Sequence, residues 1–175
     1  MTTHPTVLIT GASTGIGAVY AERFAQRGHD LVLVARDHSR LETLAAKLRG
    51  EHNVTIEVLA ADLTQLSDLH TVEARLRDDV RIGILINNAG AAQSGSFIEQ
   101  SADSVAQLVA LNTTALVRLA SAIAPRLAKA GEGAIINIGS VVALAPEFGM
   151  SVYGATKAFV LFLSQGLSLE LSPQG

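Results

Sequence analysis

The sequence lacks cysteine and tryptophan altogether, and its 13 lysines and arginines are outnumbered by 16 acidic residues. The absence of cysteine excludes disulfides, thiolate metal sites and cysteine nucleophiles. A formal net charge of −3, with no run of Lys or Arg, predicts no nucleic-acid-binding surface. No stretch reaches the roughly 18–20 consecutive apolar residues of a membrane helix, and the start lacks the features of a signal peptide. We therefore expect a cytoplasmic protein with no membrane partner.

The histidines are few and scattered. None of the five has a second histidine four residues away, so the sequence predicts no metal site and disfavours a metal-dependent hydrolase. The histidines are His4, His29, His38, His52 and His70.

With 49% hydrophobic residues and 17% charged ones, the chain is expected to fold, and residues 1–175 have the length of a single domain.

Short apolar runs alternate with stretches of helical periodicity. Near-continuous apolar runs are typical of strands buried on both faces of a parallel sheet. Their alternation with helices predicts right-handed βαβ units, hence an α/β protein with a doubly wound parallel sheet and helices on both faces. The predicted strands are 7–10, 31–35, 54–59, 84–86 and 134–138, and the predicted helices are 16–28, 41–50, 69–80, 101–130 (one or two helices) and 151–171.

A glycine-rich segment joins the first strand to the first helix. Its spacing, G-x-x-x-G-x-G, differs from both the G-x-G-x-x-G fingerprint and the phosphate-binding P-loop. Glycine lets the backbone approach an anion, and a helix N-terminus favours a pyrophosphate, although the same glycines could merely form a tight turn. The candidate phosphate-binding residues are Gly11, Ser13, Thr14, Gly15, Ile16 and Gly17.

The end of the second predicted strand bears on which nucleotide is preferred. An acidic residue there would bind a ribose 2′-hydroxyl, but this chain has Ala35 followed by Arg36. A guanidinium suits a 2′-phosphate, so NADP is favoured over NAD. The adjacent Asp37 weakens this interpretation, and an ordinary surface arginine remains the alternative.

Tyr153 and Lys157 lie four residues apart and therefore share one face of a helix. A free tyrosine has a pKa of about 10, and a nearby ammonium lowers it, which makes a workable general acid/base pair. Ser140 follows the fifth predicted strand at the edge where ligands bind in such sheets. Asn112 is a poor helix former inside a helical region, either for a functional reason or as an exposed amide.

Taken together, these features resemble the short-chain dehydrogenase/reductase family over essentially the whole chain. Residues 10–17 match the family's cofactor turn, Asp62 its adenine-binding acid, and residues 87–90 its Asn-Asn-Ala-Gly motif. Asn112, Ser140, Tyr153 and Lys157 match its four catalytic positions in order. The cofactor-binding positions that the resemblance implies are Gly11, Ser13, Thr14, Gly15, Ile16, Gly17, Arg36, Asp62, Leu63, Asn88, Ala89, Gly90, Tyr153 and Lys157.

The resemblance implies a Rossmann-like fold and hydride transfer between NADP(H) and a small carbonyl or alcohol substrate. In that scheme Tyr153 is the general acid/base and Lys157 assists it and binds the nicotinamide ribose. Ser140 orients the carbonyl, and Asn112 holds a water that links Lys157 to solvent. It also implies a homodimer or homotetramer formed through 101–130 and 151–171. The alternatives are a non-catalytic nucleotide-binding module and a purely structural protein.

The chain departs from the family in its length. Family members usually run to about 250 residues, in keeping with a sheet of six or seven strands. We therefore expect the sequence to be C-terminally incomplete, which would leave the activity of the 175-residue form in doubt. The fifth strand would then be a sheet edge, and apolar residues of the last helix would be uncovered. These residues are Phe159, Val160, Phe162, Leu163 and Leu167.

Overall fold

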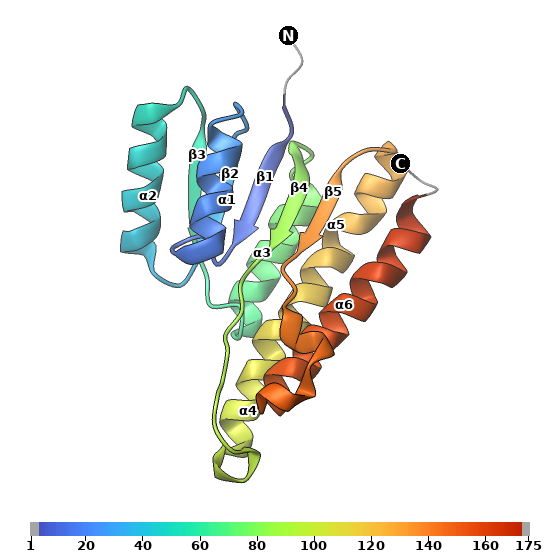
Figure 1. The fold of residues 1–175 in the computed structure, drawn as a ribbon. Helices are drawn as coiled ribbons and strands as arrows, with labels where there is room; N and C mark the ends of the chain where they lie inside the picture. Colours follow the sequence, from blue (N-terminus) through green and yellow to red (C-terminus); the bar gives the residue numbers. More distant parts are fainter. Residues whose placement is uncertain (1–3, 173–175) are drawn as a thin grey trace.

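The computed structural model describes residues 4–172, and these form one parallel sheet flanked by helices (Figure 1). The strand order is β3-β2-β1-β4-β5, and every pair is parallel. Residues 1–3 and 173–175, which bear on our expectations about a leader and about the end of the chain, lie outside the described residues. The strands are β1 (Thr6–Thr10), β2 (Leu31–Ala35), β3 (Ile56–Ala60), β4 (Ile82–Asn87) and β5 (Ala134–Asn137).

Helices connect the successive strands, as the alternation in the sequence predicts. Three single-turn 3₁₀ helices also occur after β4 and β5: η1 (Phe97–Glu99), η3 (Val141–Leu144) and η4 (Pro146–Phe148). The long helices are α1 (Gly15–Ala25), α2 (His38–Glu51), α3 (Leu66–Asp78), α4 (Ala102–Val109), α5 (Leu116–Ala130) and α6 (Ser151–Leu171), with a π-helical turn, η2 (Ala110–Ala115), between α4 and α5.

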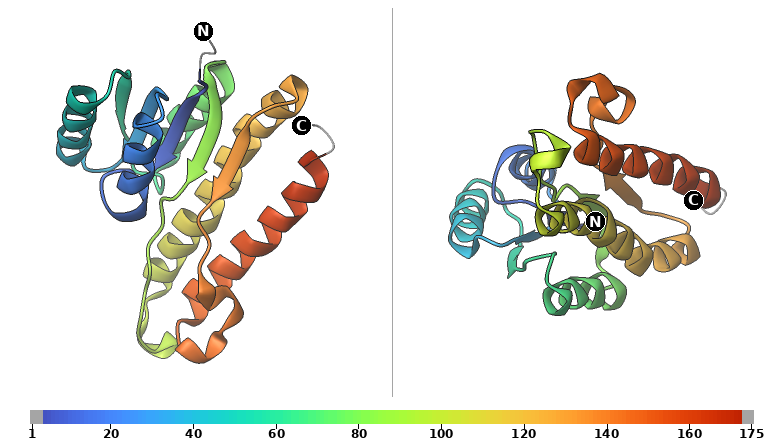
Figure 2. Two further views of the ribbon diagram at one scale, coloured as in Figure 1. Left: turned by 45° about the horizontal axis from the view of Figure 1, so that its top comes forward. Right: turned by 90° about the horizontal axis from the view of Figure 1, so that it is seen from below.

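The sheet buries apolar side chains on both faces, which explains the continuous apolar runs of its strands. Val7 and Ile9 of β1 point into a core shared with α1 and α2. Leu8, between them, points into a second core shared with α3 and α5. Figure 2 shows these two helical layers on opposite sides of the strands. The predicted α/β fold with a doubly wound, Rossmann-like sheet is therefore confirmed.

Helix α1 packs small residues against the sheet. Ala21 and Ala25 are buried, whereas Ile16 is 56% exposed. The larger Tyr20 and Phe24 are partly buried against the same core. The predicted helix is confirmed.

Residues 101–130 form one continuous helical path, α4–η2–α5, rather than two separate helices. Within residues 4–172 this path is the helix that is long and apolar enough, by length and composition alone, to cross a membrane. Leu119 and Ile123 of α5 are fully buried in the core against the sheet. These apolar residues therefore pack the helix against the sheet.

The boundaries of two predicted elements shift for identifiable reasons. The third strand begins at Ile56 rather than residue 54, because the backbone N–H of Thr55 donates to the Asp30 carboxylate (2.6 Å) instead of joining the ladder. The third helix covers Leu66–Asp78 and not 69–80. Val80 lies beyond its end and is exposed.

Strand β5 is at one end of the sheet order, as expected. On α6, Phe159 and Phe162 are exposed, which agrees with the predicted uncovered surface. Val160, however, is buried, so that part of the prediction is wrong. Figure 2 shows α6 running alongside β5 and the α4–α5 path at this end of the molecule, and α6 contacts α4, η2 and η3.

Candidate active site

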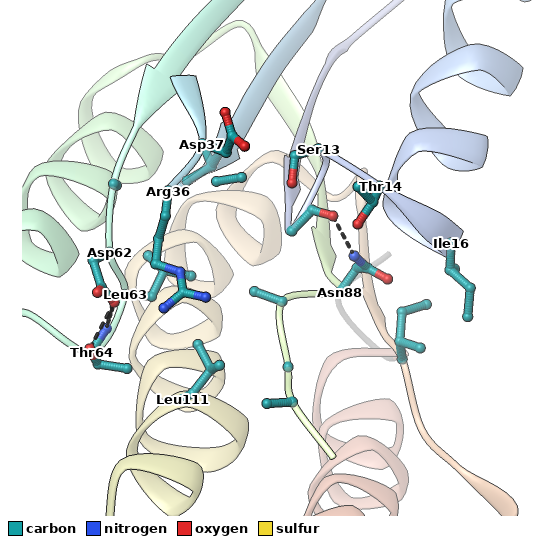
Figure 3. A pocket seen from close by; sticks show the side chains of 18 of the residues that line it. Ser13, Thr14, Ile16, Arg36, Asp37, Asp62, Leu63, Thr64, Asn88 and Leu111 are labelled. Atoms are coloured by element: carbon teal, nitrogen blue, oxygen red, sulfur yellow. Dashed lines mark hydrogen bonds between the residues drawn. The ribbon is translucent and has the colours of Figure 1, made fainter. Parts of the chain in front are cut away.

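A cleft of about 600 Å³ opens at the carboxyl ends of the strands. Strands β1 and β4 are neighbours at the point where the chain reverses its direction across the sheet, which is where ligands bind in open α/β sheets. The segments that follow all five strands contribute to the cleft wall, and α6 closes its far end. Figure 3 shows the cleft with ten of its lining residues labelled.

The glycine-rich turn forms one wall of this cleft. Ser13, Thr14 and Ile16 line it, and Gly11 adopts a φ of +64° that favours glycine. A Cβ on Gly17 would lie 2.5 Å from Asn88 Nδ2 and would also clash with the Gly11 carbonyl oxygen. Gly17 therefore serves the close approach of α1 to the strand, whereas Gly15 and Gly17 themselves do not line the cleft.

The start of α1 has free hydrogen-bonding capacity. Thr14 precedes the helix, but its side chain makes no capping hydrogen bond, and no acidic residue occupies the first turn. The first N–H groups of a helix have no intrahelical partners, and the helix dipole favours negative charge beside them. This end of α1 thus suits a phosphate group.

The segment after β4 is tied to the glycine-rich turn. Asn88 Nδ2 donates to the carbonyls of Thr10 (2.9 Å) and Gly11 (3.1 Å). The hydroxyl of Thr10 in turn accepts from the backbone N–H groups of Asn88 and Ala89, each at 3.0 Å. Asn88, Ala89 and Gly90 all line the cleft. The Asn-Asn-Ala-Gly motif therefore supports the cleft wall as well as lining it.

At the end of β2, two arginines and one aspartate line the cleft: Arg36, Asp37 and Arg40. Figure 3 shows Arg36 reaching into the cleft on the side of Asp62 and Leu111. Asp37 caps α2 by accepting from the backbone N–H of Arg40 (3.0 Å), and its carboxylate lies 3.3 Å from Arg40 Nε. The carboxylate of Asp37 is thus already engaged by α2.

Asp62 lines the cleft after β3, next to Leu63. One of its oxygens accepts from the backbone N–H (3.0 Å) and the hydroxyl (2.7 Å) of Thr64. Burial raises the pKa of Asp62, but these two hydrogen bonds and the charge of Arg36 outweigh it and hold the pKa below its usual value. The carboxylate is therefore ionised at neutral pH and keeps one oxygen for a donor.

Tyr153 and Lys157 both line the cleft from α6. The ammonium nitrogen of Lys157 lies 5.9 Å from the centroid of the Tyr153 ring and donates to the carbonyl of Ile138 (2.7 Å). Lys157 is only 7% exposed, and this burial lowers its pKa. The structure thus brings a phenol and a buried ammonium together in the cleft that the glycine-rich turn also lines.

The other two predicted catalytic residues lie near the cleft without lining it. Ser140 follows the lining residues Ile138 and Gly139, and its hydroxyl oxygen accepts from the backbone N–H of Val142 (3.4 Å) at the start of η3. Asn112 is buried in η2, where its side-chain amide is occupied by protein partners. Its amide nitrogen has no proton left to donate to a bound water.

Several lining residues were not identified from the sequence. Arg40 stands four residues after Arg36, in the first turn of α2, and this spacing was an available signal. The others lie within two residues of positions that were identified or come from the distant η2 turn, for which the sequence offers no signal. They are Val34, Ala61, Thr64, Leu111, Ile138 and Gly139.

The fold and the cleft define a Rossmann-like α/β protein with a site for a phosphate-bearing ligand at its switch point. The model of the short chain dehydrogenase family matches residues 5–175. The chain therefore belongs to the short-chain dehydrogenase/reductase family.

Solved structures of high similarity exist. The short-chain dehydrogenase from Sphingobium yanoikuyae in complex with NADPH is 71% identical, with a TM-score of 0.97 over 98% of this chain and 68% of that one. The bulky-bulky ketone specific alcohol dehydrogenase from Comamonas testosteroni is 66% identical, with a TM-score of 0.98 over 99% of this chain and 70% of that one.

More distant curated relatives are longer. The very-long-chain 3-oxoacyl-CoA reductase-A of Danio rerio is 31% identical over 96% of this chain, which covers 54% of that protein. The chain thus spans about half the length of the first curated relatives that it matches.

Proposed function

We propose that the protein is an NADP(H)-dependent oxidoreductase that interconverts a ketone and its alcohol. The observation that carries this proposal is the pairing of Tyr153 with the buried Lys157 on the cleft that also contains the glycine-rich turn. A phosphate-binding turn alone would suit any nucleotide-binding module. A phenol beside a buried ammonium adds the means to transfer a proton.

The cleft fits a dinucleotide. Its volume of about 600 Å³ lies within the usual range for ligand pockets, roughly 300–1,000 Å³. The start of α1 would hold the pyrophosphate, and the free oxygen of Asp62 would accept from the adenine amino group. Lys157 would bind the nicotinamide ribose. When bound, NADPH supplies the hydride.

The preference for NADP over NAD rests on the residues after β2. Arg36 and Arg40 offer two guanidinium groups to a 2′-phosphate. In the sequence, the acidic Asp37 next to Arg36 argued against a preference for NADP. Its carboxylate caps α2 and pairs with Arg40, which occupies one position on each oxygen and leaves it less able to accept from a ribose 2′-hydroxyl. The complex of the 71%-identical Sphingobium protein with NADPH supports the same preference.

In the proposed reduction, the Tyr153 hydroxyl donates its proton to the carbonyl oxygen of the substrate. The ammonium of Lys157 stabilises the phenolate that remains. Ser140 donates to the same carbonyl oxygen, and it can do so while its hydroxyl oxygen accepts from the Val142 N–H. Asn112 holds the cleft wall through its hydrogen bonds to the backbone of Ala91, and its amide oxygen keeps a lone pair for the water proposed to link Lys157 to solvent.

The proposed substrate is an apolar, bulky ketone. Val141, Leu144 and Phe148 of η3 and η4 follow Ser140 and expose large apolar side chains. The charged residue between Ser140 and Phe148 is Glu147 of η4, an exposed acid that disfavours an anionic substrate. The 66%-identical Comamonas enzyme is described as specific for bulky-bulky ketones, which supports this class of substrate.

The decisive experiment compares Tyr153→Phe with the wild-type protein. Reduction of a panel of aryl and alkyl ketones is followed by NADPH absorbance, and NADPH binding by fluorescence titration. We expect kcat to fall about 10²–10⁴-fold while NADPH affinity changes little, because only the proton donor is removed. Tyr20→Phe removes a hydroxyl from α1, outside the cleft, and serves as the control. Unchanged turnover in Tyr153→Phe would refute the catalytic role and favour a nucleotide-binding module.

The assembly expected for this protein is a homodimer or homotetramer in the cytoplasm. The exposed Phe159 and Phe162 on α6 support self-association, since large exposed apolar surfaces favour contact with another chain. Sedimentation of the wild-type protein and of Phe162→Ser tests this. A wild-type monomer at micromolar concentration would contradict it.

A further inference from the structure

The buried amide of Asn112 joins two segments that are distant in the sequence. Asn112 is 2% exposed and lies in η2. Its Oδ1 accepts from the backbone N–H of Ala91 (2.9 Å), and its Nδ2 donates to the carbonyl of the same residue (2.9 Å). This two-point pairing holds the segment after β4 against the α4–α5 path.

Thr156 on α6 makes the third hydrogen bond of this amide. Its hydroxyl oxygen accepts from Asn112 Nδ2 (3.1 Å), and its hydroxyl donates to the carbonyl of Tyr153 (2.7 Å). Because the hydroxyl proton is committed to Tyr153, only the oxygen faces Asn112. The Thr156 oxygen therefore requires the NH2 group of Asn112, not its oxygen, as its partner. This sets the orientation of the Asn112 amide and places its oxygen at the Ala91 N–H.

The segment held in this way lies close to the candidate catalytic lysine. A Cβ on Gly90 would lie 3.2 Å from Asn112 Oδ1 and 3.8 Å from Lys157 Nζ. Gly90 and Ala91 line the cleft with Lys157. Thr156, which is buried like Asn112, therefore joins α6 to this segment through the Asn112 amide.

We propose that Thr156 is a positioning residue that acts through Asn112 to fix the Gly90–Ala91 wall relative to Tyr153 and Lys157. Its importance for turnover rests on the function proposed above. The structural link from Thr156 through Asn112 to Ala91, by contrast, rests only on the hydrogen bonds described. Small displacements of groups that position a substrate or cofactor can reduce turnover up to about 10²-fold.

The test has one readout that needs no cofactor. Thr156→Val removes the hydroxyl with little change in volume, and Thr156→Ser retains it. Hydrogen exchange of the Ala91 backbone N–H is measured by NMR on the protein without nucleotide. We expect exchange at Ala91 to accelerate at least about tenfold in the valine variant, as its acceptor loses its anchor, and to return to the wild-type rate in the serine variant.

The second readout is turnover. We expect kcat for ketone reduction to fall about tenfold or more in Thr156→Val, with less change in KM, and to recover in Thr156→Ser. Thr113→Val is the control, since its hydroxyl donates to the Val109 carbonyl within the same helical path. Thr156→Ala is measured as well as Thr156→Val. If one of these variants does not fold, the other still tests the proposal.

The outcomes separate the two proposals. Unchanged exchange at Ala91 in both hydroxyl-free variants would overturn the positioning role, whatever the turnover. Faster exchange with unchanged kcat would overturn its importance for catalysis. Faster exchange at Ala91 in the hydroxyl-free variants, combined with a wild-type protein that reduces no ketone, would support the structural link and refute the proposed function.

Discussion

The ammonium of Lys157 lies 5.9 Å from the centroid of the Tyr153 ring, one helical turn along α6. At the same time it donates to the carbonyl of Ile138, the residue after β5. The lysine thus connects α6 to the end of β5, the outer strand at one side of the described sheet. Burial disfavours the charged form of Lys157 and lowers its pKa below that of an exposed lysine. The ammonium is therefore present beside the phenol only at pH values below this lowered pKa.

This pKa predicts how the reaction depends on pH. Burial lowers the pKa of Lys157 from the ordinary value of 10.5, and the cation predominates only below the lowered pKa. The rate of ketone reduction should therefore fall as the pH rises through a value below 10.5. The pH profile of kcat/KM checks this, together with NMR titration of Lys157 Nζ, with the exposed Lys47 as an internal reference. A lysine that titrates at or above its ordinary value would contradict the prediction.

The cofactor preference should depend on the two arginines after β2. Arg36→Ala and Arg40→Ala should each raise the KM for NADPH about 10–100-fold, the range expected for one lost charge-assisted hydrogen bond. The KM for NADH should change little, because NADH has no 2′-phosphate. Arg23→Ala, on the exposed side of α1, is the control. Equal losses with both nucleotides would show that the arginines serve the fold and not the phosphate.

Two glycines should respond oppositely to alanine. Gly17→Ala brings a Cβ against Asn88 Nδ2 and the Gly11 carbonyl, and should destabilise the protein by about 1–3 kcal/mol and weaken NADPH binding. Gly50→Ala meets nothing within 4 Å, near the end of α2, and should stabilise by up to about 1 kcal/mol. Urea denaturation measures both. A Gly17→Ala protein as stable as wild type would refute the close approach of α1 to the turn.

Asp79 should stabilise the fold in a pH-dependent way. Its carboxylate accepts from Arg81 Nη2 (2.7 Å) and Arg75 Nε (3.0 Å), with the Arg81 hydrogen bond the main reason that its pKa falls from 3.8 to about 2. A lowered pKa stabilises the folded state above the unfolded value. The stabilisation, about 1–2 kcal/mol with solvent screening of the partly exposed arginines, is lost as the pH falls from about 4 to about 2.

The variant pair for this prediction is Asp79→Asn and Asp78→Asn. Asp78 is the neighbouring, exposed carboxylate and controls for the change in net charge. The free energy of unfolding in urea should drop in Asp79→Asn at pH 7, and the difference from wild type should shrink toward pH 2. Equal effects of the two substitutions would mean that the ion pairs contribute nothing specific.

Local features of the sequence predicted the strands, the helices and the cleft. Alternating apolar runs and helical patterns led to the α/β sheet, and the turn at 11–17 was placed correctly at its edge. Tyr153 and Lys157 share a helix face at four residues' spacing, so their proximity also follows from local geometry. Each of these features depends on residues that are close in the chain.

The features that sequence reasoning missed depend on contacts between distant segments. The close packing of Gly17 against Gly11 and Asn88 brings together α1 and the segment after β4. The role of Asp37 followed from its position at the start of α2, where it became a cap instead of a ligand-binding acid.

The order of strands and helices, the glycine turn and the phenol–ammonium pair follow from local sequence, because neighbouring residues set backbone geometry. The hydrogen bonds of Asn112 to Ala91, 21 residues before it, and to Thr156, 44 residues after it, depend on the tertiary fold. They form because η2 packs between the segment after β4 and α6. Packing over these separations has no periodic signal in the sequence.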